Sequence, residues 1–320
     1  MIDLPDLWFA LVFALLGTFL FLDGFDFGVG ALFATRDDEE ERETLLAAIG
    51  PVWDGNEVWL VVFGGALFAV FPAAYAGLFS RHYPLMFAIL ATLILRGVAP
   101  EFYEQREDDG WRRAWSASFV VGSVAAPFLL GMFAANWVLG ATSVVNVPAV
   151  ALGLAVVALT VVEGAAFLGL KTRGALREEM ATVAVRAAPA YLVLVVAVVG
   201  YLAFARPDLR GALASPLSLT AVVLTVALVA GVVVAARGRR YLAAFVAAGG
   251  LPYALVAFAA NLLYPSVDPA AGLSVSEGVV SELPLTLMTG ATALLLPVVL
   301  VYFAVLYSVF SGPAEPDEAY

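Results

Sequence analysis

One arginine and five acids lie within the long apolar segments of this 320-residue sequence. Asp23 and Asp26 are three residues apart, as are Asp54 and Glu57, and this spacing places each pair on one face of a helix. Ionisable side chains inside a membrane are costly, and they mark proton or ion pathways by default. Carboxylates grouped near a guanidinium could bind and release protons. The six candidates are Asp23, Asp26, Asp54, Glu57, Arg96 and Glu163.

The segments that carry these residues define the class of protein. Hydrophobic residues make up 62% of the sequence and the mean hydropathy is +0.95, far above the values of a soluble domain. Apolar runs of about 20 residues, enough to cross a bilayer, recur along the chain. We predict an all-α polytopic membrane protein, with one integral membrane domain over 1–320 and a short acidic tail at 312–320. The nine predicted spans are 7–33, 52–71, 83–99, 115–139, 147–170, 188–205, 217–236, 241–264 and 283–310.

Basic residues are distributed unevenly between the predicted loops. Twelve of the 16 lysine and arginine residues fall in the loops after the odd-numbered spans, three fall in the other loops, and Arg96 lies within a span. Cytoplasmic loops carry an excess of such residues. We therefore predict that the N-terminus lies outside the cell and that the tail at 312–320 is cytoplasmic.

The orientation also sets the depth of the buried charges. At a rise of ~1.5 Å per residue, Asp23 is roughly 24 Å from the outer end of its span, Glu163 about 24 Å and Arg96 about 20 Å. Asp54 and Glu57 begin a span that starts in the cytoplasm. We predict that all these residues share the cytoplasmic third of the membrane. One arginine cannot neutralise five acids, so we expect them to line a hydrated proton entrance.

Less specific roles remain open for single residues. Arg96 could serve only as a counter-ion that holds helices together. Asp54 could complement the dipole at a helix N-terminus after Pro51. Trp53 fits a belt of interfacial aromatic residues, or it could pack on a cofactor held by a neighbouring protein.

Other counts exclude several kinds of site. The chain has no cysteine and one histidine, His82, which excludes thiolate metal sites and a bis-histidine haem within this chain. The net charge of −11 argues against nucleic-acid binding.

Several motifs resemble one known family. They are D-G-F-D-F-G-V-G at 23–30, G-P-V-W-D-G-N-E-V-W-L at 50–60 and G-G-A-L-F-A at 64–69, with looser matches at W-R-R-A-W (111–115), E-G-A-A-F-L-G-L-K-T-R-G (163–174) and L-T-L-M-T (285–289). In this order they are similar to subunit II of the cytochrome bd quinol oxidases. Two positions differ: Glu57 stands where relatives commonly have glutamine, and Ser116 stands where some have an acid.

The resemblance implies a fold and a function. Such complexes oxidise membrane quinol and reduce dioxygen to water, and subunit I is the partner that carries haem b, haem d and the quinol-oxidation loop. Subunit II is expected to form two four-helix bundles plus one peripheral helix and to ligate no haem. By motif position, Asp54 belongs to a proton channel, while Asp23, Asp26 and Arg96, with Trp53 beside Asp54, support the haem site or proton access. Membrane lipid, quinone and possible small accessory subunits are further expected partners.

Two functions of other classes remain as alternatives. A stand-alone ion-coupled transporter could use the same buried charges, although it should show broken helices at the midplane and an inverted repeat. A purely structural membrane scaffold is the other.

Overall fold

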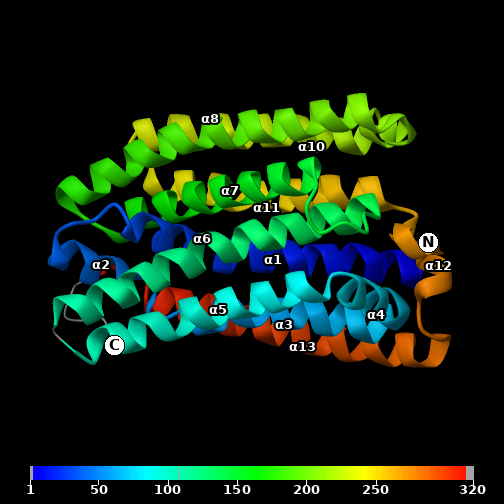
Figure 1. The fold of residues 1–320 in the computed structure, drawn as a ribbon, viewed down its shortest axis with the longest axis horizontal. Helices are drawn as coiled ribbons and strands as arrows, with labels where there is room; N and C mark the ends of the chain where they lie inside the picture. Colours follow the sequence, from blue (N-terminus) through cyan, green and yellow to red (C-terminus); the bar gives the residue numbers. More distant parts are fainter. Residues whose placement is uncertain (1–2, 107, 315–320) are drawn as a thin grey trace.

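The computed structural model describes residues 3–106 and 108–314. Long helices run side by side along one axis, with short elements at both ends (Figure 1). The long helices are α1 (Leu4–Phe33), α3 (Trp53–Val70), α5 (Tyr83–Glu104), α6 (Asp109–Leu139), α7 (Val147–Lys171), α8 (Gly174–Ala205), α10 (Pro216–Arg237), α11 (Tyr241–Leu263) and α13 (Glu282–Val309). The protein is therefore an all-α polytopic membrane protein, as predicted.

Eight of these helices, among the residues described, are long and apolar enough to cross a membrane by themselves. Helix α2 (Glu39–Ile49) and α3 meet at a bend of 48° and pass the same test only as a pair, so the number of spans is nine if this pair counts as one. Glycine permits close packing between spans: a Cβ atom on Gly28 of α1 would overlap the backbone of Thr160 and Gly164 in α7. Glycine at the interface between membrane helices is typical of such a close approach.

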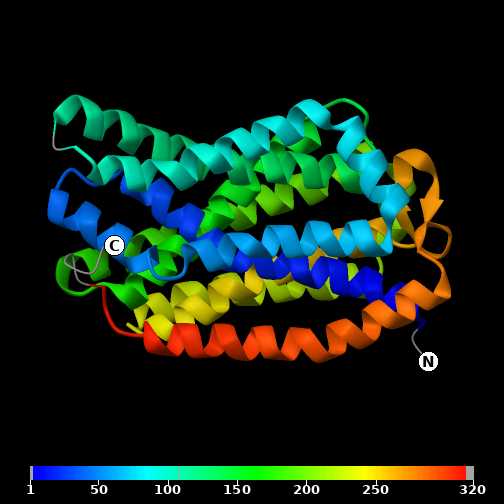
Figure 2. The same cartoon turned by 90° about the horizontal axis from the view of Figure 1, so that it is seen from below.

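The spans form two groups. In the first, α1 packs against α3 and α6, and α6 against α5; in the second, α7, α8, α10 and α11 pack around one another. Contacts of α1 with α7 and α11 join the two groups. Helix α13 lies along the outside (Figure 2), and its residues Phe303 and Tyr307 contact α3. This is the expected arrangement of two four-helix bundles with one peripheral helix.

Short elements distinguish the two ends of the molecule. Helix α2 lies at one end, which we call the α2 end (Figure 1). The other end, which we call the hairpin end, carries a two-stranded antiparallel sheet. The elements there are α4 (Pro72–Arg81), η1 (Pro207–Leu209), α9 (Arg210–Leu213), β1 (Ser266–Asp268), η2 (Pro269–Ala271), β2 (Leu273–Ser274) and α12 (Val275–Gly278).

Three helices extend further than the predicted spans. Helix α8 begins at Gly174 rather than at 188, α6 begins at Asp109 rather than at 115, and α5 ends at Glu104 rather than at 99. Each extension is polar and lies at the α2 end. Hydropathy marks the part of a helix that lies in hydrocarbon, whereas capping residues set its first and last turns. At the start of α6, for example, the Asp108 side chain accepts a hydrogen bond from Trp111 N at 3.0 Å. Of the predicted tail at 312–320, residues 315–320 lie outside the described part.

Candidate functional site

Arg96 is the centre of a cluster of buried charges. Its side chain on α5 is 1% exposed. Its Nη2 atom lies 2.9 Å from Asp23 Oδ1 and 4.0 Å from Asp26 Oδ2, both on α1, and its Nη1 atom lies 3.7 Å from Glu57 Oε2 on α3. The i,i+3 spacing of the two aspartates turns both carboxylates toward the same guanidinium. Three helices thus meet at one charge.

Aromatic rings and a close helix contact enclose the guanidinium. The Arg96 Cζ atom lies 4.5 Å from the Phe27 ring centroid and 5.7 Å from that of Trp53, within the range of cation–π attraction. A Cβ atom on Gly122 of α6 would lie 2.7 Å from both the backbone nitrogen and the Cβ of Arg96. Glycine at this position therefore lets α6 press against α5 and close the cluster on that side.

The charges of the cluster do not balance. Three carboxylates face one guanidinium, and neither Asp26 Oδ1 nor Arg96 Nε has a hydrogen-bond partner among the residues that the structure describes. Asp23 Oδ1 is close enough to Arg96 for an ion pair, but its geometry does not satisfy a hydrogen bond. Buried polar groups are normally hydrogen-bonded. This cluster therefore has unused capacity to bind protons or water.

Exposure falls stepwise from the first turn of α3 into the cluster. Asp54 is exposed, the Glu57 side chain is 31% exposed, and Asp23 and Asp26 are fully buried. Asp54 and Glu57 are near enough to interact electrostatically, and Glu57 interacts in turn with both buried aspartates. The acids therefore form a graded series from the surface of the chain to Arg96.

Two residues of the cluster were not predicted from the sequence. Asn56 is fully buried, and its Nδ2 atom donates to Asp26 Oδ2 at 2.8 Å. Tyr307 on α13 donates its hydroxyl proton to Asn56 Oδ1 at 2.7 Å. An amide within an apolar run was a signal for Asn56. Nothing in the sequence singled out Tyr307 among the other aromatic residues of the last span.

Glu163 belongs to a different environment. It lies on α7, is fully buried, and sits so close to α1 that a Cβ atom on Gly24 would collide with its carboxylate. Its electrostatic neighbours are Tyr191 and Tyr253, and Arg96 is not among them. Gly24 follows Asp23, so Glu163 has a similar depth but contacts another face of α1. The structure brings together the other acids and leaves Glu163 apart.

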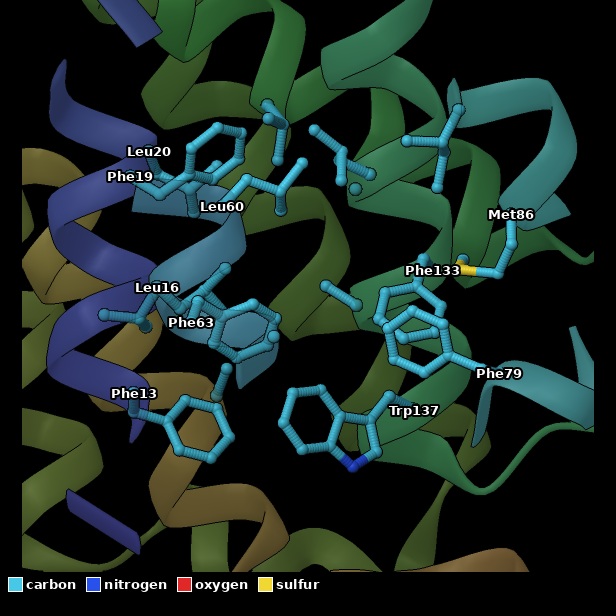
Figure 3. A pocket seen from close by; sticks show the side chains of 18 of the residues that line it. Phe13, Leu16, Phe19, Leu20, Leu60, Phe63, Phe79, Met86, Phe133 and Trp137 are labelled. Atoms are coloured by element: carbon cyan, nitrogen blue, oxygen red, sulfur yellow. The ribbon is translucent and has the colours of Figure 1, made fainter. Parts of the chain in front are cut away.

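A large cavity lies between α1, α3 and α6, on the hairpin side of the cluster (Figure 3). Its volume is about 560 Å³, and rings such as Phe63, Phe133 and Trp137 line it. No carboxylate, amine or guanidinium lines it. The Trp137 Nε1 atom, its most polar group in Figure 3, already donates to Val267 O at 2.8 Å. The cavity accepts hydrocarbon but offers no proton-binding group.

The sequence matches the model of one protein family, cytochrome bd terminal oxidase subunit II, over residues 4–310. The chain belongs to this family.

Individual relatives agree with this assignment. The chain is 38% identical over 192 residues to cytochrome bd ubiquinol oxidase subunit 2 of Bacillus subtilis (strain 168), covering 55% of this chain and 56% of that protein. It is 35% identical over 188 residues to cytochrome bd-I ubiquinol oxidase subunit 2 of Escherichia coli (strain K12), covering 53% and 49%. A probable cytochrome oxidase subunit 2 of Haemophilus influenzae is 33% identical over 194 residues. The chain spans about half the length of the relatives it matches.

The family name raises the question of whether this subunit II chain could hold a haem. Its one histidine, His82, is buried at the hairpin end, roughly 20 Å along α5 from Arg96. The imidazole packs edge-on against Phe133 at 6.1 Å between ring centroids, next to Arg81 and Asp268. Neither ring nitrogen has a hydrogen-bond partner among the described residues, but a single histidine can supply at most one of the two imidazoles of a bis-histidine haem. We derive no step of the mechanism through a haem in this chain.

Proposed function

We propose that the chain is the non-haem-ligating subunit II of a cytochrome bd-type terminal oxidase in the plasma membrane. In this proposal the complex oxidises membrane quinol and reduces dioxygen to water. Haem b and haem d are held by subunit I, where they supply the oxygen chemistry. Lipid and quinone surround the complex, and small accessory subunits could join it. The family membership and the printed names of the relatives support this assignment, and we expect the isolated chain to be inactive.

We infer that the α2 end faces the cytoplasm and that the N-terminus faces out. The excess of basic residues falls in loops at the α2 end. Several are tied to neighbouring helices there: Arg36 contacts Glu179 of α8 at 2.5 Å, and Arg112 of α6 contacts Glu39 of α2 at 2.5 Å. The exposed end of the acid series, Asp54, also lies at the α2 end.

The proton route that we propose starts at Asp54 and Glu57. Asp54 takes a proton from cytoplasmic water, and Glu57 passes it on to the buried pair Asp23 and Asp26. Arg96 stabilises the carboxylate that has given up its proton, because an opposite charge at about 3–4 Å favours the ionised form. Trp53 packs on Arg96 and helps to hold this side of the chain in shape for the haem site of the partner.

One observation carries this proposal: a single guanidinium is shared by carboxylates of two other helices, and the most exposed acid, Asp54, lies on the α2 side of them. Glu163 stays part of the proposal as a second buried acid on the far face of α1. Glu163→Gln is then expected to affect turnover less than changes near Arg96.

The test uses the complete complex in its membrane. The double variant Asp54→Asn/Glu57→Gln should lower quinol-driven oxygen uptake and proton uptake at least about tenfold, in line with the loss of a general acid–base group. Asp208→Asn is the matched control, since Asp208 is an exposed acid at the hairpin end. Normal uptake in the double variant would refute the route.

Purification distinguishes the oxidase from the alternatives. A haem protein should co-purify with this chain and show haem d absorption. A chain that purifies alone and moves a solute across vesicles would support an ion-coupled transporter. A chain that purifies alone without transport would support a structural scaffold.

A further inference from the structure

Helix α13 makes an unexpected connection to the charge cluster. It lies outside both bundles (Figure 2), and the apolar part of the helix has no buried residue. Near its cytoplasmic end, however, Tyr307 points inward and reaches Asn56, which in turn reaches Asp26. The Tyr307 ring lies 6.4 Å from Phe25 and 6.5 Å from Phe303, between centroids. Packing therefore holds the hydroxyl group at the amide.

The chemistry of an amide gives this connection a direction. The asparagine side chain has one accepting oxygen and one donating NH₂ group. In the structure Nδ2 donates to Asp26 Oδ2, and Oδ1 accepts from Tyr307. This polarity suits an ionised Asp26, which can only accept. A protonated Asp26 that donates to the amide would need Asn56 Oδ1 to face it. The amide would then have to turn, and Asn56 Nδ2 would donate to Tyr307.

The two oxygens of Asp26 consequently have different roles. Oδ2 is held by Asn56, while Oδ1 has no hydrogen-bond partner within the described residues. The Arg96 guanidinium lies 4.0 Å from Oδ2, too far for a hydrogen bond. Asn56 is therefore the donor that orients this carboxylate, and Oδ1 remains open to an incoming proton.

We propose that Asn56 and Tyr307 are positioning residues that keep Asp26 ready to accept a proton, with Tyr307 selecting the orientation of the amide. Neither residue carries the proton itself, because Tyr307 contacts the amide and not a carboxylate, and an amide is neither a useful acid nor a useful base at neutral pH. The proposal rests on the proton route described above. It adds that the peripheral helix α13 carries none of the charged residues of the cluster but controls, through Tyr307, the proton uptake of the buried Asp26.

Tyr307→Phe tests this proposal in the complete complex. The variant keeps the ring and removes the hydroxyl group, so the amide loses its fixed orientation and ionised Asp26 loses a reliable donor. The acidic limb of turnover against pH should move to higher pH by about half a unit to one unit, because one hydrogen bond shifts an equilibrium about three- to tenfold. Asn56→Leu removes the donor outright and should move the limb the same way.

Tyr302→Phe is the matched control. Tyr302 is on the same helix, is 60% exposed, and its ring packs on Phe303. This substitution also removes a hydroxyl group, and it should leave the pH profile and the haem content unchanged. An unchanged pH profile in Tyr307→Phe would overturn the proposal. If that variant does not assemble, the profile of Asn56→Leu decides in its place.

A second measurement separates this proposal from the proton route. Infrared difference spectra of the complex, titrated with acid, report the C=O band of a carboxyl group that takes up a proton, and Asp26→Asn identifies the band of Asp26. Tyr307→Phe should shift this band, whereas Tyr302→Phe should not. A shifted band with normal proton uptake in Asp54→Asn/Glu57→Gln would refute the route but keep the positioning role. An unshifted band would refute the positioning role alone.

Discussion

Two arginines in this protein show opposite ways of using a charge away from water. At the hairpin end, Arg81 of α4 meets Asp268 of β1 in a two-point contact, with Nη1–Oδ1 at 3.0 Å and Nη2–Oδ2 at 2.9 Å. Toward the α2 end, Arg96 is shared by three acids at 2.9 to 4.0 Å. The first is a matched pair and the second an unmatched cluster.

The difference separates a structural role from a chemical one. The Arg81 pair satisfies both oxygens of Asp268 and fixes the hairpin to α4; Val280 N also donates to Val70 O nearby, at 3.0 Å. The Arg96 cluster leaves acceptor and donor atoms unused. We infer that the matched pair stabilises the fold, and the unused atoms of the unmatched cluster support its part in the proposed proton route.

The largest expected effect comes from removing the centre of the unmatched cluster. Arg96→Leu would leave three acids without a counter-charge, and breaking a buried ion pair in this way costs about 3–5 kcal/mol. We expect the complex to lose its haem content and its turnover, measured from the haem absorption of purified membranes. Arg96→Lys keeps the charge and should retain part of both. Normal haem content in Arg96→Leu would show that the cluster does not depend on its arginine.

The matched pair should give a smaller effect of another kind. Arg81→Ala or Asp268→Ala should lower the free energy of unfolding by about 1–3 kcal/mol, because one partner stays behind unpaired. The midpoint of thermal unfolding of the purified complex measures this loss. The dependence of turnover on pH should be the same as in the natural protein. A changed pH profile would mean that the hairpin end also takes part in proton transfer.

Apolar segments made most of the fold predictable. A stretch such as 147–170 can only be placed as a membrane-spanning helix, so the long helices followed from hydropathy and spacing. The ends of the helices could not be predicted from hydropathy, because polar segments such as 174–187 are helical without being apolar. The hairpin was also missed, since its Ser-, Pro- and Gly-rich sequence shows no strand alternation.

The sequence predicted how far along its helix each site residue lies, but not toward which neighbouring helix its side chain points. Helical rise placed Glu163 and Asp23 at one level, yet Glu163 contacts the face of α1 that carries Gly24 and not the face toward Arg96. Rotation about the helix axis depends on packing with neighbours, which a single sequence does not reveal. The contact of Tyr307 with Asn56 joins positions 251 residues apart. Only the folded structure shows it.

The smallest effect that we predict concerns His82, beside the matched pair. Burial lowers the pKa of His82, and the positive charge of Arg81 lowers it further, although Asp268 opposes this. Below about pH 6.5, the ordinary histidine value, the unfolded chain takes up a proton that the folded chain refuses. The free energy of unfolding should therefore fall as the pH drops through 6.5, by at most about 1.4 kcal/mol per pH unit, and should level off below the lowered pKa.

His82→Phe should remove this dependence, because phenylalanine keeps a ring against Phe133 but binds no proton. The check is thermal unfolding of the purified complex between pH 5 and 8. In the natural protein, the free energy of unfolding should change with pH as expected for the uptake of about one proton. Arg81→Leu should make the slope shallower, since the nearby positive charge no longer opposes protonation. An equal slope in His82→Phe would show that the proton uptake belongs to other groups and that His82 does not cause the pH dependence.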